Sequence, residues 1–360
     1  FHSSEQPQAL PLWIAYGKKQ GAQLLLVPQI LDWHERQGST AGVTEPAHVR
    51  VEFFLINIAN GSIMSRSVFE ERQEGLVDNL MNVASQAAVS AIVSIGMFLA
   101  ILTAGIDLSV GSVLALSAMM MGIASDRWGW GAYPSMLVCL GSGALLGLVN
   151  GLLLTKLRLP HPFISTLGMQ KMARGIALFV TAAAPISMFP DEIQYLGNNS
   201  IGQVPVSFIL VAILYIGMYF FLTRTSTGRY IYAVGGNKEA ARLSGIKVNS
   251  ILNLVYTISG FTAALAGLVL AGRVNAVYPL AGLDYETDAI AAVIIGGASF
   301  FGGVGSIANT IIGVLLIAVL RNGLNLLNVD SAFQTFAIGA VIVVAVAVDV
   351  LRQNVLKSAR

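Results

Sequence analysis

The sequence predicts an all-α, polytopic membrane protein with about nine to ten transmembrane helices, including one short broken or re-entrant segment. Three observations lead to this prediction. Only 11% of the 360 residues are charged and 55% are hydrophobic, whereas a soluble globular domain carries about 25% charged residues. The mean hydropathy is +0.71. Apolar segments recur from about residue 83 onward, and most are close to the ~20 residues that cross a bilayer.

The charge and the metal-binding residue types argue against several other classes of protein. A formal net charge of +2 is too small to indicate a nucleic-acid partner. The single cysteine, Cys139, lies inside an apolar run, which excludes a disulfide framework and a thiolate metal site. No two of the four histidines have metal-ligand spacing, so we expect no metal and no cofactor.

The sequence also lacks the motifs of an ATPase or a membrane enzyme. It has no G-x-x-x-x-G-K-[ST] phosphate loop, because Gly235-Gly236-Asn237-Lys238 has the wrong spacing and follows no expected strand. No H-E-x-x-H pair and no Ser/His nucleophile arrangement occurs. We therefore expect a transport subunit with no catalytic residues, and ATP hydrolysis only by a separate partner.

The first part of the chain, residues 1–75, differs from the rest. Its apolar runs at residues 22–30 and 51–58 are short and interrupted, and neither reaches the length of a span. The start lacks the basic region of a signal peptide. We expect an N-terminal region with at most one weak span, at residues 51–64, followed by a transmembrane domain at residues 76–360.

Nine recognisable segments follow in the transmembrane domain. They are residues 83–103, 110–124, 135–154, 163–183, 206–222, 251–272, 289–301, 307–320 and 333–348. Segment 289–301 is too short to cross alone, and it is rich in glycine together with the residues that follow it, up to Gly305. Irregular backbone at membrane depth is tolerated only where protein buries it or where it lines a cavity.

Small and polar residues within the segments predict how the helices pack. Gly143, Gly147 and Gly151 are four residues apart on one helix face, which allows a close approach of two backbones. Asn150, beside this face, is expected to make an interhelical hydrogen bond, with contact to a polar solute as the alternative. Asp107 interrupts an apolar region, and we expect it to cap the next helix through Ser109 and Val110, with a pathway role as the alternative.

The longest charged run of the apolar region, residues 229–247, predicts a short capped helix. Asn237 can accept hydrogen bonds from free backbone N–H groups, and Glu239 then lies in the first turn, where the helix dipole favours an anion. Gly245 can end the helix in the left-handed conformation. A soluble partner could grip such a helix; the alternative is an ordinary solvated loop.

The basic residues predict the orientation. If residues 229–247 face the cytoplasm and the spans alternate, the C-terminus is also cytoplasmic. The basic residues then inside are Lys156, Arg158, Arg224, Arg229, Lys238, Arg242, Lys247, Arg352, Lys357 and Arg360. After residue 100, only Arg127, Arg273 and Arg321 remain outside, as the positive-inside rule requires. Few ionisable residues lie inside the spans, which favours a neutral polar solute.

From about residue 76 to the C-terminus, the chain resembles the permease subunits of bacterial ABC importers for monosaccharides. The likeness is to the ribose, galactose and xylose group, and most of all to ribose permeases. Four runs carry it, at residues 101–112, 228–245, 288–303 and 322–327. The run Gly235-Gly236-Asn237-Lys238-Glu239-Ala240-Ala241-Arg242-Leu243-Ser244-Gly245 is the most distinctive part of the second.

This resemblance implies a function, partners and a location. It implies the translocation path for a ribose-like monosaccharide in the bacterial inner membrane. The expected partners are a cytoplasmic ABC ATPase, a periplasmic sugar-binding protein, membrane lipid and a second permease copy, as a homodimer or with a paralogue. A secondary carrier or channel for a small neutral polar solute is the alternative. Members usually begin with a clear first span, from which residues 1–75 depart.

The resemblance also implies roles for individual residues. The stretch from Gly236 to Gly245 would be the coupling helix that docks into the ATPase. The residues expected to contact the ATPase are Gly236, Asn237, Glu239, Ala240, Ala241, Arg242 and Gly245. The residues expected to line the pathway are Asp107, Asn150, Asn322 and Asn325.

Overall fold

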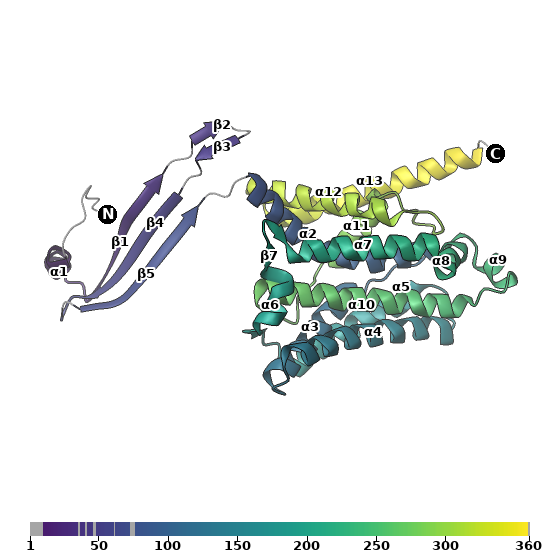
Figure 1. Cartoon of the computed structure of the whole chain (residues 1–360), viewed down its shortest axis with the longest axis horizontal. Coiled ribbons are helices and arrows are strands. Elements are labelled where there is room, and N and C mark those ends of the chain that lie inside the picture. The colour runs from purple at the N-terminus through teal and green to yellow at the C-terminus, as the bar shows by residue number, and fades with distance from the viewer. Residues whose placement is uncertain are drawn as a thin grey trace. The chain divides into compact units, whose positions relative to one another are not determined.

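The computed structural model describes residues 10–34, 37–39, 42–45, 48–60, 62–72 and 76–358. The chain divides into two compact units, Phe1–Leu80 and Met81–Arg360. Figure 1 shows that strands make up most of the first unit and helices almost all of the second. Arg360, which the sequence places with the cytoplasmic basic residues, lies outside the described residues.

The first unit is built around a small antiparallel sheet. Its elements are α1 Leu10–Lys19, β1 Leu24–His34, β2 Gln37–Ser39, β3 Gly42–Glu45, β4 His48–Asn57 and β5 Ser62–Arg72. Strands β1, β4 and β5 pair in the order β1-β4-β5, and β2 pairs with β3. Val27, Ile56 and Ile58 form its buried core.

This sheet corrects two expectations for the N-terminal region. The all-α class does not hold there, and residues 51–64, expected as a weak span, instead form parts of β4 and β5. The apolar run is rich in β-branched and aromatic residues but too short for a span, which favours a strand. Asn57 and Asn60 then turn the chain, since their Oδ1 atoms accept the Ala59 and Ser62 N–H groups.

The second unit is a helical bundle, as expected. Its helices are α2 Leu76–Leu102, which enters this unit at Met81, α3 Val110–Asp126, α4 Ala132–Lys156, α5 Pro162–Thr181, α6 Asp191–Asn198, α7 Val206–Arg224, α8 Ser226–Gly236, α9 Lys238–Leu243, α10 Val248–Val274, α11 Tyr285–Ile295, α12 Ile307–Leu326 and α13 Ser331–Ser358. Two pairs of two-residue strands, β6 Ile186–Ser187 with β9 Ala276–Val277 and β7 Ser200–Ile201 with β8 Val204–Pro205, tie its loops together.

Each of the nine segments expected from the sequence overlaps a helix of this bundle, and only residues 289–295 of segment 289–301 are helical. In the described part of the chain, six helices are long and apolar enough to span a membrane, namely α2, α4, α7, α10, α12 and α13. The 17 residues of α3 form a shorter apolar helix. The polytopic class is therefore confirmed, and the count of nine to ten crossings stays a prediction.

Helix α10 packs against α4 through glycines, as the small-residue spacing predicted. A Cβ atom added at Gly147 would collide with the Tyr256 carbonyl oxygen and lie 3.0 Å from the Gly260 Cα atom. A Cβ atom added at Gly143 would lie 2.5 Å from the Gly260 carbonyl oxygen. The two backbones are thus in direct contact, which only residues without side chains permit.

We predict that Gly147→Leu lowers the thermal stability of the bundle, because a side chain at this position pushes α4 away from α10. Overpacking of this kind costs about 1–3 kcal/mol or more. Thermal unfolding in detergent, followed by size-exclusion chromatography, measures the effect. Gly141→Leu is the matched control, since an added Cβ at the exposed Gly141 meets no atom within 4 Å. Equal melting temperatures for the two variants would contradict the packing.

Candidate functional site

Helix α9 is capped at both ends by the residues that the sequence indicated. The Ala240 N–H donates to Asn237 Oδ1 at 3.0 Å, so Asn237 is the N-cap. At the other end, Gly245 adopts a left-handed φ of +83°. The Ile246 N–H then donates to the Ala241 carbonyl oxygen at 3.0 Å and closes the helix. The short helix is therefore determined by local chemistry.

Most of α9 projects into solvent. Glu239 and Arg242 are exposed and form an ion pair with one another at 2.8 Å. Leu243 is 80% exposed and presents an apolar side chain on this surface. Ala241 alone in this helix is buried, and it belongs to the main hydrophobic core. Ala241, one of the residues expected to meet the ATPase, therefore anchors the helix in the core. Leu243 was not among those residues, yet its side chain lies on the exposed surface.

Helix α8, just before α9, packs against two segments where helices of the bundle end: the end of α2 and the loop after α11. Gly235, near the end of α8, is buried, and an added Cβ would collide with the Leu102 carbonyl oxygen and lie 2.7 Å from the Gly303 nitrogen. The Gly303 N–H donates to that same Leu102 oxygen at 2.9 Å. The Tyr232 hydroxyl donates to the Gly305 carbonyl oxygen at 2.9 Å.

We call this meeting of three segments, residues 102–105, 232–236 and 302–305, the glycine junction. Gly302 and Gly303 have φ values of +85° and +71°, a conformation that glycine adopts without strain. An added Cβ at Gly302 would lie 2.7 Å from the Ala104 nitrogen. The junction thus connects the base of α9 to the end of α2 and to the glycine-rich loop after α11.

The half-length helix expected at residues 289–301 is present as α11, followed by irregular backbone. Helix α11 has 11 residues and ends at Ile295. The backbone after it folds back on itself, with the Ser299 N–H donating to the Val304 carbonyl oxygen at 2.8 Å. Asp349 of α13 accepts from the Ser299 hydroxyl and the Phe300 N–H, both at 3.2 Å. Protein groups therefore satisfy several of the hydrogen-bonding groups of this loop.

Asp107 and Asn150 lie together in a buried polar cluster. Asp107 Oδ1 accepts from the Ser109 N–H at 3.0 Å and from its hydroxyl at 2.5 Å. Asp107 Oδ2 accepts from the Ser259 hydroxyl at 2.7 Å. Asn150 Nδ2 donates to Ser109 Oγ at 3.3 Å and reaches Asp107 Oδ1 at 3.5 Å.

This cluster decides part of what the sequence left open. The interhelical hydrogen bond expected of Asn150 is present. The Asp107 carboxylate accepts from the Ser109 N–H as expected, but Ser109 itself is the N-cap of α3. Among the described residues, the Val110 N–H makes no bond to Asp107. The cluster holds the interruption between α2 and α3 against α4 and α10, because its members come from all of these elements. A pathway role for Asp107 and Asn150 stays a prediction.

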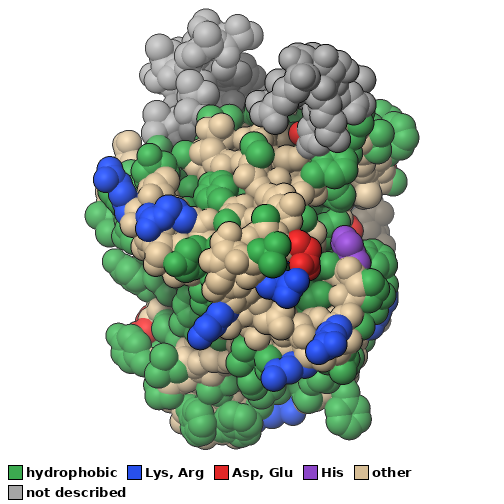
Figure 2. All heavy atoms as spheres, turned by 90° about the vertical axis from the view of Figure 1, so that its right-hand side faces the viewer, with side chains coloured by type: hydrophobic (Ala, Val, Ile, Leu, Met, Phe, Trp, Pro, Cys, Tyr) green, Lys and Arg blue, Asp and Glu red, His purple; other side chains and the backbone are tan. Residues whose placement is uncertain are grey.

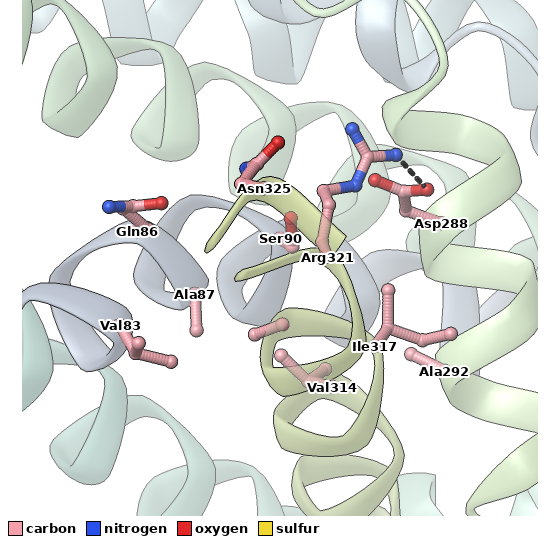
Figure 3. A pocket seen from close by; sticks show the side chains of 11 residues that line it. Val83, Gln86, Ala87, Ser90, Asp288, Ala292, Val314, Ile317, Arg321 and Asn325 are labelled. Carbon is pink, nitrogen blue, oxygen red and sulfur yellow. Dashed lines mark hydrogen bonds and ion pairs between the residues drawn. The ribbon is translucent and has the colours of Figure 1, made fainter. Parts of the chain in front are cut away.

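A cavity of about 60 Å³ opens between α2, α11 and α12. Figure 3 shows its lining, with polar groups at one end and apolar side chains at the other. Arg321 Nη2 donates to Asp288 Oδ1 at 2.7 Å in this cavity. The residues that line it are Val83, Gln86, Ala87, Ser90, Asp288, Ala292, Val314, Ile317, Ala318, Arg321 and Asn325.

The two asparagines of α12 that the resemblance assigns to the pathway differ in their relation to the cavity. Asn325 lines the cavity, whereas Asn322, one turn earlier, is not among the lining residues. Asp288 and Arg321 were not singled out for the pathway, although they are two opposite charges within or beside apolar segments. Such charges inside a bundle tend to pair and to mark functional sites, and that signal could have found them.

One end of the bundle is basic. Thr155 at the end of α4 donates to Asn253 near the start of α10 at 2.8 Å, so these helix ends lie together. In Figure 2, which faces this end of the molecule, Lys and Arg side chains outnumber acidic ones. The exposed basic residues on the loops and helix ends concerned are Lys156, Arg158, Arg224, Arg229, Lys238, Arg242 and Lys247.

We predict that Gly235→Ala disrupts the glycine junction, because the new methyl group would overlap the Leu102 carbonyl oxygen. Backbone cannot move aside as a flexible side chain does, so we expect the free energy of unfolding to fall by about 1–3 kcal/mol or more. Limited proteolysis between α8 and α9, together with thermal unfolding, measures it. The matched control is Gly236→Ala, where an added Cβ meets no atom within 4 Å. A Gly235→Ala variant as stable and as protease-resistant as the control would refute the junction.

Most of the chain is similar to known permease proteins. Residues 79–346 match the family described as branched-chain amino acid transport system / permease component. The ribose import permease protein RbsC of Escherichia coli (strain K12) is 41% identical over 307 residues, which cover 83% of this chain and 92% of that protein.

Two further relatives come from the same organism. The D-allose transport system permease protein AlsC of Escherichia coli (strain K12) is 43% identical over 277 residues, or 76% of this chain and 83% of AlsC. The xylose transport system permease protein XylH is 32% identical over 332 residues, or 75% and 84%. No solved structure matches the chain. The chain therefore belongs to the branched-chain amino acid transport system permease component family, and its relatives include permeases for ribose, allose and xylose.

Proposed function

We propose that this chain is the membrane subunit of an ABC importer that carries a ribose-like monosaccharide across the bacterial inner membrane. A separate cytoplasmic ATPase supplies the energy, and a periplasmic binding protein delivers the sugar. The observation that supports this most directly is α9, a capped and exposed helix that stands on a buried junction. The identities of 32% to 43% to sugar permeases support the choice of a monosaccharide.

The orientation follows from charge. The basic end of the bundle carries α8 and α9, and the positive-inside rule assigns such an end to the cytoplasm. Figure 1 places the C-terminal end of α13 at the same end of the bundle as α9. With α9 in the cytoplasm, the C-terminus is cytoplasmic too, and the start of α2 faces the periplasm.

The contact with the ATPase is made by the exposed surface of α9. Leu243 would insert into an apolar groove of the partner, while Glu239 and Arg242 would exchange their mutual ion pair for pairs across the interface. An exposed ion pair contributes only about 0–1 kcal/mol, so this exchange costs the permease little. Gly236, Asn237, Ala240 and Gly245 shape the helix and its ends.

Force on α9 would reach the membrane segments through the glycine junction. The junction joins α9 to the interruption after α2 and to the glycine-rich loop after α11. Both are short, irregular segments that can reorient at less cost than a long packed helix. Alternate opening of the path toward the periplasm and the cytoplasm would follow from their displacement.

A second permease copy, identical or paralogous, would complete the path. Helices α12 and α13 keep large apolar side chains exposed, including Leu316, Val319, Phe336 and Val343. Lipid and a partner subunit are the two surroundings that accept such faces.

We predict that the double variant Glu239→Ala/Arg242→Ala and the single variant Leu243→Asp each lower the amount of ATPase that co-purifies by at least ten-fold. The first removes the charges of the interface, and the second puts a charge into an apolar contact. Quantitative pull-down from membranes measures the loss. Lys156→Ala, which removes an exposed basic residue from the same end of the bundle, is the control.

Two results would contradict the proposal. One is full retention of the ATPase by both α9 variants. The other is wild-type sugar flux in vesicles that contain the permease but no ATPase, which would indicate a carrier or channel instead.

A further inference from the structure

We propose that the polar end of the cavity between α2, α11 and α12 is a contact site for the sugar on its way through the membrane. The site consists of Gln86, Ser90, Asp288, Arg321 and Asn325. This inference rests on the proposed function and adds the groups that recognise the substrate.

The ion pair in the cavity is neutral as a unit but not saturated with hydrogen bonds. Arg321 Nη2 donates to Asp288 Oδ1, and the Asp288 side chain is only 5% exposed. Arg321 Nε is buried and has no hydrogen-bond partner among the residues that the structure describes. A buried donor without a partner is unfavourable, so a movement of the Arg321 side chain that brings this N–H to a ligand oxygen is favoured.

The remaining polar groups are all uncharged. Gln86 and Asn325 carry amides, and Ser90 carries a hydroxyl, each able to donate and accept. Gln334 of α13 donates to Asn325 Oδ1 at 2.8 Å, which holds this amide at the edge of the cavity. Figure 3 shows Asn325, Arg321 and Ser90 close together at the polar end.

This combination fits a neutral polyhydroxylated ligand. Because Asp288 and Arg321 neutralise each other, the cavity has no net charge to hold an anion, a cation or both ends of an amino acid. Vicinal hydroxyl groups, by contrast, present alternating donors and acceptors. No aromatic ring is among the lining residues, so the sugar is not held by stacking, which suits a site that must release it.

The position of the cavity also fits. Gln86 precedes the end of α2 by 16 residues, or about 24 Å of helix. The end of α2 belongs to the glycine junction, near α9. The cavity therefore lies in the half of the bundle away from α9, where a periplasmic binding protein would release its sugar.

The test uses the complete importer in proteoliposomes, with labelled ribose as the substrate. We compare ribose taken up per ATP hydrolysed for wild type, Asn325→Ala and Asp288→Asn/Arg321→Gln. Each variant should lower this ratio about five-fold or more, because each removes at least one hydrogen bond to the sugar. The ATPase activity stimulated by the binding protein should stay within about two-fold of wild type.

Asn309→Ala is the matched control, since it is the same substitution at an exposed residue of α12 outside the cavity, and it should leave the ratio unchanged. Asn325→Ala keeps the ion pair, so it remains informative if the double variant fails to fold. Uptake per ATP equal to that of Asn309→Ala in both variants would overturn the inference and leave the proposed function standing. Loss of ATPase stimulation together with uptake would also overturn it, as the sign of a structural role. Failure of the wild type to import ribose with ATP would instead refute the proposed function.

Discussion

The hydrogen bond from the Gly303 N–H to the Leu102 carbonyl oxygen ties together the parts of the bundle that are not regular helix. In lipid, each backbone group must find its partner within the protein. Helix α2 ends at Leu102, and the loop after α11 supplies the missing donor. The bond forms only because Gly235, Gly302 and Gly303 lack side chains and let three backbones meet. An exposed helix such as α9 therefore rests on a closely packed, hydrogen-bonded base.

Two elements connect this base to the cavity. The first half of α2 lines the cavity and its last residue accepts the junction bond. Asp288 in the first turn of α11 also lines the cavity, and the loop that follows α11 contributes Gly303. A displacement at the junction therefore acts on two walls of the cavity at once. In the proposed importer, this geometry would give the coupling between ATPase and sugar a physical route, made of one long helix and one half-length helix.

Local chemistry made some of these features predictable. Asn237 and Gly245 define the ends of α9 through bonds within a few residues, and the glycines of α4 announce a close approach by their spacing alone. Hydropathy predicts the apolar segments because it, too, depends only on residues that are close together in the sequence. The N-terminal sheet does not follow from hydropathy, because the run at residues 51–58 is apolar like part of a span, while its aromatic and β-branched residues also favour a strand.

The polar sites depended on contacts between distant parts of the chain. Asp107 and Ser259 are 152 residues apart, and Asp288 and Arg321 come from two helices. Nothing in the spacing of these residues reveals that they meet. Even the two candidate asparagines of α12 look equivalent in sequence, and only the three-dimensional arrangement places one of them at the cavity.

The exposure of Leu243 has a consequence for how such a subunit survives in a cell. In the proposed importer, the Leu243 side chain stays in water until the ATPase covers it, so the unassembled permease presents one more apolar group to chaperones and proteases. Binding of that protein stabilises the folded form by mass action. The abundance of the permease would then follow the abundance of its companion, which keeps the stoichiometry of the two without any dedicated regulator.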